Sequence, residues 1–157
     1  MSQSNSTGEV AMDGSTLSLT LPSESRMLSV ARSFVEAVCQ AHRLDRSATH
    51  ALVIVTGEAI TNIVRHAHQN RPGSQMELHL QILPEVVVMT FRDQGDPFDL
   101  SAVPDLPPGE LRIGGRGVFL MRTLMDELTC QPLGEGQSGN VLRMVKRRDT
   151  AEQRNVG

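Results

Sequence analysis

Residues 57–68 read GEAITNIVRHAH, and this run decides the fold that the sequence predicts. Its apolar residues recur at helical spacing. Glu58 and Asn62 are four residues apart, which places a carboxylate and an amide one turn apart on one helix face. The amide oxygen of Asn62 can enter the octahedral shell of magnesium. The carboxylate of Glu58 can take a proton from an attacking hydroxyl. Taken alone, both could be solvated surface residues.

The elements around this run predict an α+β protein. Asp45 opens the helix and Arg71-Pro72-Gly73 ends it. Before it we expect a half-buried strand that stops at Pro22 and a helix that Ser23 caps. After it come two strands joined at Pro84-Glu85 as a hairpin. The expected segments are a strand at 17–21, a helix through 28–38, and strands at 76–83 and 86–92.

A second motif, Asp93-Gln-Gly95-Asp-Pro97, follows the hairpin. A carboxylate at a strand end can accept a hydrogen bond from the exocyclic amine of adenine. Gly95 carries no side chain, so a flat base could lie against the backbone. The alternative is an ordinary turn, because Asp, Gly and Pro are the residues that turns favour.

A third motif, Gly114-Gly115-Arg116-Gly117, precedes a helix expected at Val118–Leu128. Free amides and the positive end of a helix dipole can bind phosphate, and glycines let it approach the backbone. A plain glycine hinge is the alternative. Two strands, near 129–133 and 140–146, end the domain. The whole order predicts a two-layer α/β sandwich, with a mixed, mostly antiparallel sheet and helices on one face.

The segment between the second and third motifs has no apolar period. Residues 93–117 hold four prolines and five glycines, and loops this long in compact domains are usually functional or disordered. We expect Leu100–Ile113 to be a lid that is mobile without nucleotide and closes over bound phosphates.

Composition excludes several classes of protein. The only lysine is Lys146, so neither a P-loop nor a eukaryotic kinase fold is possible. A net charge of −3 and an aromatic content of 3% argue against direct binding of nucleic acid. Cys39 and Cys130 are far apart and are expected to be reduced thiols.

The ends of the chain are polar. We expect a disordered tail at 1–14, one domain at 15–147 and a flexible tail at 148–157. The N-terminus has no signal-peptide pattern, and the apolar runs are too short to span a membrane. A cytoplasmic protein without membrane contact is therefore expected.

The three motifs, in this order, resemble the N box and the two glycine boxes of the GHKL (Bergerat-fold) ATPases. The run GEAITNIVRHAH is similar to the N box, FRDQGDPFD to the first glycine box and GGRGVFLMRTLMDEL to the second. The nearer likeness, over about residues 15–147, is to the bacterial anti-sigma factor serine-protein kinases of the RsbW and SpoIIAB type.

The resemblance implies a role for each matching residue. Glu58 would be the general base, Asn62 the magnesium ligand and Asp93 the residue that reads adenine. Gly95 would lie under the base, and Gly115 and Gly117 would line the phosphates.

Three further positions follow from the resemblance. Arg116 could face phosphate or solvent, and His66 would support the helix or the pocket. The family often opens its last strand with Gly-Thr, whose hydroxyl helps to hold a water beside adenine. Here the pair is Gly139-Asn140, and the Asn140 amide could hydrogen-bond similarly.

The function that the resemblance implies is an ATP- and Mg²⁺-dependent serine-protein kinase and anti-sigma factor. It would phosphorylate a STAS-domain anti-anti-sigma protein, bind a sigma factor and form a homodimer. An ATP-binding partner-switch module with little kinase activity is the alternative. The ATPase half of a histidine kinase is disfavoured, because no helix with a phospho-acceptor histidine precedes the domain.

Overall fold

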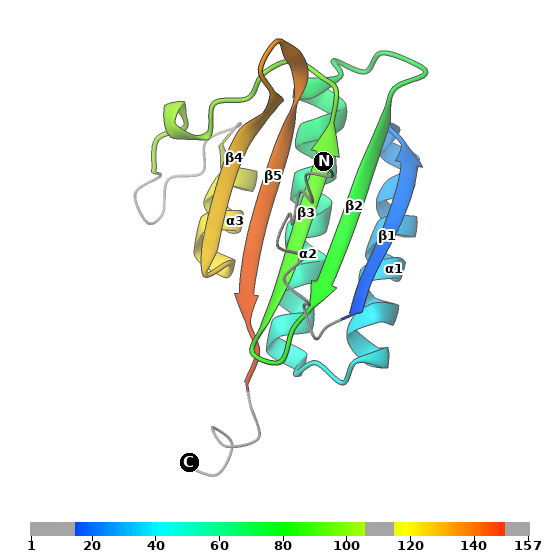
Figure 1. Ribbon diagram of the computed structural model, residues 1–157, viewed down its shortest axis with the longest axis vertical. Helices are drawn as coiled ribbons and strands as arrows, with labels where there is room; N and C mark the ends of the chain where they lie inside the picture. The colour runs from blue at the N-terminus through cyan, green and yellow to red at the C-terminus, as the bar shows by residue number, and fades with distance from the viewer. Residues whose placement is uncertain (1–14, 106–114, 150–157) are drawn as a thin grey trace, which may run out of the picture.

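In the described part of the chain, five strands form one sheet, and three α-helices cover one of its faces (Figure 1). The computed structural model describes residues 15–105 and 115–149. The strand order is β1-β2-β3-β5-β4. The elements are β1 (Ser15–Pro22), α1 (Leu28–Ala41), α2 (Arg46–Asn62), β2 (Gln75–Ile82), β3 (Val86–Asp93), α3 (Arg116–Leu124), β4 (Glu127–Gly134) and β5 (Gln137–Arg147). The predicted α+β sandwich with helices on one face is confirmed.

Every strand pair in the described sheet is antiparallel. The expected hairpin joins β2 to β3, and its tight turn is closed by the Leu83 amide, which donates to the Val86 carbonyl at 2.9 Å. In β2 and β3 buried and less buried residues alternate, because one face of the sheet packs on helices and the other faces solvent. In the register of β3 and β5, Asp93 lies opposite Asn140.

The core lies between the sheet and α2, the central helix of the layer. Leu52, Val55 and Ile60 of α2 are fully buried, as are Met89 and Phe91 of β3. Truncation of such a side chain to alanine leaves a cavity and typically destabilises a domain by about 2–5 kcal/mol. This packing fixes the opposite face of α2, which carries the half-buried Glu58 and Asn62.

Helix α2 begins as the sequence predicts and ends differently. The carboxylate of Asp45 accepts a hydrogen bond from the Ala48 amide at 2.9 Å and caps the helix. After Asn62 the chain continues as one π-helical turn, Ile63–Ala67. The apolar spacing predicted a plain α-helix there. Such turns insert one residue into a helix and often occur at functional sites.

By length and composition, the helical stretch Arg46–Ala67 could cross a membrane. Here it is the central core helix, and 56% of its most apolar window is buried inside the protein. Core helices pass the same test, so this stretch is accounted for by packing on the sheet.

Two helix boundaries differ from the sequence prediction. Helix α3 ends at Leu124 rather than Leu128, because Met125 has extended backbone angles and β4 starts at Glu127. Leu128 therefore packs from a strand. Ser23 does not cap a helix: its hydroxyl is 2.7 Å from Nδ1 of the buried His68, and Glu24 precedes the first 3-10 turn.

Several predicted segments lie partly or wholly outside the described residues. The predicted tail at 1–14 lies wholly outside, as do residues 106–114 of the predicted lid and 150–157 of the C-terminal tail. The first residue of that tail, Arg148, makes hydrogen bonds to the domain. Its guanidinium donates to the carbonyls of Leu83 and His42 at 2.8 and 3.2 Å.

Candidate active site

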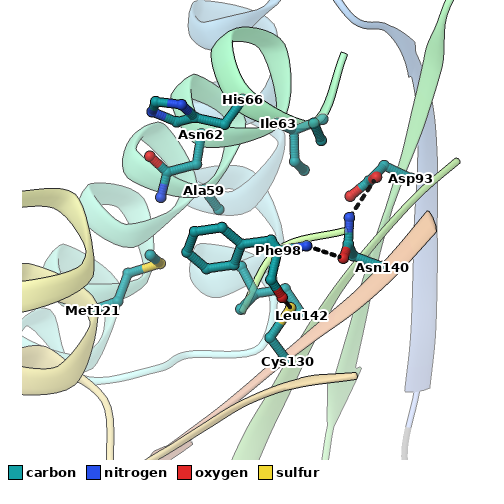
Figure 2. Close-up of a pocket in the computed structure, with 11 residues that line it drawn as sticks. Ala59, Asn62, Ile63, His66, Asp93, Phe98, Met121, Cys130, Asn140 and Leu142 are labelled. Atoms are coloured by element: carbon teal, nitrogen blue, oxygen red, sulfur yellow. Dashed lines mark hydrogen bonds between the residues drawn. The ribbon is translucent and has the colours of Figure 1, made fainter. Parts of the chain in front are cut away.

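A pocket opens between the helices and the ends of β3 and β5 (Figure 2). Its remaining cavity has a volume of only about 30 Å³, room for one or two water molecules. The side chains that line it come from α2 and its π turn, the end of β3 and the segment that follows it, α3, β4 and β5. They are Ala59, Asn62, Ile63, His66, Ala67, Asp93, Phe98, Met121, Cys130, Asn140 and Leu142.

Asp93 lies at the end of β3 and is only 3% exposed. Its Oδ1 accepts hydrogen bonds from the Gly95 amide at 2.8 Å and from Nδ2 of Asn140 at 3.1 Å. Within the described residues, both hydrogen bonds to this carboxylate fall on Oδ1, and Asp93 lines the pocket. A buried carboxylate held in this way can present its second oxygen to an N–H donor of a ligand.

Two glycines let the surrounding backbone close around Asp93. A Cβ atom on Gly95 would lie 2.3 Å from the carbonyl oxygen of Ala67, so only glycine fits against the π turn. A Cβ on Gly139 would lie 2.2 Å from the Asp93 carbonyl oxygen, and Gly139 has a φ of +131°. Both backbone approaches are closer than any side chain permits.

Phe98 fills much of the pocket. Figure 2 shows its ring directed toward Asn62, Ala59 and Met121. Its amide donates to Oδ1 of Asn140 at 2.9 Å, and its carbonyl accepts from Sγ of Cys130 at 3.7 Å. The pocket is therefore apolar in the middle, with polar groups at the Asp93 end.

The other end of the site is formed by Glu58, Asn62 and Gly117. A Cβ atom on Gly117 would lie 2.7 Å from Oε2 of Glu58 and 3.7 Å from Oδ1 of Asn62. Because Gly117 has no side chain, the start of α3 can lie close to the Glu58 carboxylate and the Asn62 amide oxygen of α2. The structure brings these three predicted residues together.

The glycine motif forms the N-terminus of α3. Gly115 has a φ of +83° and precedes the helix, and as a glycine at the N-cap it has no side chain to cap the first turn. Free amides at such a turn suit an anion. Arg116 is exposed, Gly115 and Gly117 are half-buried, and Gly114 lies outside the described residues.

The start of the predicted lid is tied to α3 by Arg122. The guanidinium donates to the carbonyls of Leu100 and Val103 at 2.9 and 2.8 Å, and to Oδ1 of Asp105 at 2.9 Å. Leu100 and Val103 also pack against the core. The described part of this segment, up to Asp105, is therefore anchored to the helix that carries the glycine motif.

The histidines and the cysteine near the pocket have separate environments. His66 is exposed and lines the pocket, whereas His68 is buried. Burial lowers the pKa of His68. Burial and the nearby carboxylates of Asp93 and Asp99 raise the pKa of Cys130 to about 11, which keeps it a neutral thiol. In the described part of the chain no three His, Cys, Asp or Glu side chains gather as a metal cluster.

Sequence reasoning missed the apolar lining of the pocket. Phe98 directly follows the Asp93–Pro97 motif, and an aromatic residue at that place was a usable signal. Met121 and Leu142 were recognisable only as apolar residues of a helix and a strand. Arg122 gave no signal, because its partners, two backbone carbonyls and the Asp105 carboxylate, lie on a distant segment with no periodicity.

A buried carboxylate, an apolar slot and a glycine-lined helix start, in this arrangement, define a nucleotide-binding ATPase domain. The chain belongs to the histidine kinase-like ATPase domain family, whose model matches residues 21–146. It therefore binds ATP. The predicted GHKL resemblance is confirmed.

Curated relatives carry a more specific name. The chain is 30% identical to the serine-protein kinase RsbW of Halalkalibacterium halodurans, with 88% of each chain covered. It is 27% identical to the serine-protein kinase RsbW of Oceanobacillus iheyensis, over 83% of this chain and 85% of the relative. The protein of the same name from Listeria innocua is 29% identical over 71% of this chain and 76% of its own.

Proposed function

We propose that the protein is an ATP-dependent serine-protein kinase and anti-sigma factor of a partner-switching system. Its substrate is a serine of a STAS-domain anti-anti-sigma protein, and it binds a sigma factor when that protein is phosphorylated. The observation that carries the catalytic part is the close approach of Gly117, at the start of α3, to the Glu58 carboxylate and the Asn62 amide oxygen. The names of the curated relatives support the same activity.

The residues around Gly117 fit a magnesium ion that accompanies ATP. Magnesium prefers oxygen ligands and usually keeps several waters and phosphate oxygens, so it needs few protein ligands. Asn62 Oδ1 supplies one such oxygen near the start of α3. Asn62 would hold the ion, which would neutralise charge on the phosphates.

Glu58 is the proposed general base. Its carboxylate takes the proton of the serine hydroxyl as the serine oxygen bonds to the γ-phosphorus. The bond between the γ-phosphorus and the bridging oxygen of ADP breaks, and the electron pair stays on ADP. Phosphoryl transfer depends mainly on positioning and on stabilisation of charge. The protein therefore needs little more than a base, Glu58, and a helix N-terminus that binds the phosphates.

The remaining site residues would hold ATP at its two ends. Asp93 would accept from the adenine amine, with Gly95 beneath the base. Gly115 and Gly117 would approach the phosphates, and Arg116 would face either the phosphates or solvent. Asn140 belongs to the adenine end.

The proposed partners are a STAS-domain protein, a sigma factor and a second copy of this chain, all in the cytoplasm. The alternative is an ATP-binding partner switch with little kinase activity. The geometry at Glu58 favours the kinase, because a pure binding module has no need of a carboxylate beside the phosphate end.

Transfer of label tests the proposal. The purified protein is incubated with γ-³²P-labelled ATP, magnesium and a STAS-domain protein from the same genome, and the acceptor is mapped by mass spectrometry. We expect label on one serine, and none when that serine is replaced by alanine. Binding of ATP and of the partner without any transfer would establish the binding module instead.

A further inference from the structure

The side-chain amide of Asn140 is used almost entirely inside the protein. Nδ2 donates to Oδ1 of Asp93 at 3.1 Å and to the carbonyl of Asp96 at 2.9 Å. Oδ1 accepts from the Phe98 amide at 2.9 Å. An amide nitrogen has two hydrogens, so no donor of Asn140 is left for a ligand. The residue is 4% exposed.

The partners of Asn140 also fix which way its amide points. The Phe98 N–H can only donate, so it must meet the oxygen. The Asp96 carbonyl can only accept, so it must meet the nitrogen, and the Asp93 oxygen lies on the same side. In a flipped amide, the NH₂ group would face the Phe98 N–H, and the oxygen would face the oxygens of Asp93 and Asp96. None of the three hydrogen bonds could then form. The orientation therefore follows from the contacts themselves.

We propose that Asn140 is a positioning residue of the adenine end, acting through Asp93 and Phe98 and not by contact with the nucleotide. It occupies Oδ1 of Asp93 together with the Gly95 amide, so the carboxylate is held with Oδ2 as its acceptor for the base. It also holds the backbone of Phe98, whose ring forms the wall of the apolar slot (Figure 2).

The strand register supports this role. Asn140 is paired with Asp93 between β5 and β3, so the two side chains lie side by side at one sheet end. Ser138, also in β5, binds the segment that follows Asp93: its hydroxyl donates to the Gly95 carbonyl at 2.8 Å. The side-chain amide of Asn140 thus connects the Asp93 carboxylate to Phe98, whose ring lines the pocket. The inference rests on the proposed ATP site but not on kinase activity.

Asn140→Asp is the sharpest test, because it keeps shape and the acceptor for Phe98 but replaces the donor nitrogen with oxygen. The new carboxyl group would face Oδ1 of Asp93, so the pair would ionise completely only at raised pH. Other titratable groups near Asp93 are Asp96, His66, His68 and Cys130. They are the same in both proteins, as are the nucleotide's own phosphates.

ADP binding is measured by calorimetry for the wild type and the variant from pH 5.5 to 8.5. We expect the variant to bind at least about tenfold more weakly at pH 8.5. As pH falls, one shared proton restores a donor between the two carboxyl groups, so the ratio to wild type should return to within about threefold.

Asn70→Asp is the matched control, since Asn70 is exposed in the turn after the π turn. It makes the same charge change away from the pocket and should leave ADP binding unaltered. A ratio near one at pH 8.5, or a loss that is equal at every pH, would overturn the inference. Wild-type protein that binds ADP but transfers no phosphate would overturn the kinase proposal and leave Asn140 unaffected.

Discussion

The two ends of the site are built in different ways. At the adenine end, Asp93 and Asn140 are buried and joined to Gly95, Asp96 and Phe98 by hydrogen bonds. At the phosphate end, Glu58 and Asn62 are half-buried, and within the described residues no hydrogen bond of their carboxylate or amide groups is found.

The difference indicates when each end becomes ordered. A fully bonded, buried network is rigid before any ligand arrives. Glycines at a helix start, and side chains for which the described residues supply no hydrogen-bond partner, remain available to groups that ATP itself brings. We therefore expect changes at the phosphate end to act on the chemical step, and changes at the adenine end to act on binding of every adenine nucleotide.

The largest expected effect is that of Glu58→Gln. The amide cannot take the proton of the serine hydroxyl, and general base catalysis is typically worth about 10²–10⁴-fold. Phosphotransfer should fall by that factor, while Mg·ATP affinity stays within about twofold. Single-turnover transfer to the STAS-domain partner and calorimetry separate the two quantities.

Glu135→Gln is the control for Glu58, because Glu135 is exposed in the turn between β4 and β5. It should leave transfer unchanged. A Glu58→Gln protein that phosphorylates its partner at the normal rate would remove Glu58 from the role of base, and with it the proposed division between the two ends.

Asp93→Asn should have the next largest effect. The new amide leaves the adenine amine facing a mixed donor and acceptor, and loss of a charge-assisted bond costs about 1.5–3 kcal/mol. Affinity for ATP and for ADP should fall alike, at least about tenfold. Calorimetry with both nucleotides measures the loss, and Asp149→Asn is the control, because Asp149 is exposed and lies two residues beyond the end of β5. Unchanged binding would exclude Asp93 from the site.

Much of the fold was predictable because its patterns are local. The alternation in β2 and β3, the Asp45 cap and the apolar stripe of α2 each depend on neighbours in sequence. The π turn was not predictable, since an apolar period of 3.6 runs through it without a break. The end of α3 was missed because Leu128 continues that period on a strand.

The residues of the candidate site likewise differ in whether local sequence could reveal them. Glu58 with Asn62, and Asp93 with Gly95, stand in short motifs whose residue types state their chemistry. Phe98 and Arg122 act through long-range contacts to β5 and to the Leu100–Asp105 segment. Contacts of that kind form only once the chain has folded, so spacing in the sequence does not reveal them.

Asn62→Ala should have a smaller effect, and only in the presence of magnesium. The variant removes one oxygen from the proposed ion, whose other ligands come from phosphate and water. Mg·ATP affinity should fall by about three- to tenfold, or about 0.7–1.4 kcal/mol. Binding measured in EDTA should equal that of the wild type. An equal loss with and without magnesium would assign Asn62 to packing of the pocket rather than to the ion.

The smallest expected effect concerns Arg122, which joins the two ends through the described part of the predicted lid. Arg122→Lys keeps the charge but cannot reach the carbonyls of Leu100 and Val103 and the Asp105 carboxylate at once. Losing hydrogen bonds worth about 1 kcal/mol net should speed amide exchange over 100–105 about fivefold. If this segment helps the predicted lid, Leu100–Ile113, to close over the phosphates, ATP affinity should fall about two- to threefold and ADP affinity less.

Hydrogen-exchange mass spectrometry over residues 98–117, without nucleotide and with ADP or an ATP analogue, measures the protection, and calorimetry measures the two affinities. Wild-type protection that is equal in all three states would mean that closure does not depend on the γ-phosphate, and the nucleotide dependence of partner binding would then need a different moving element.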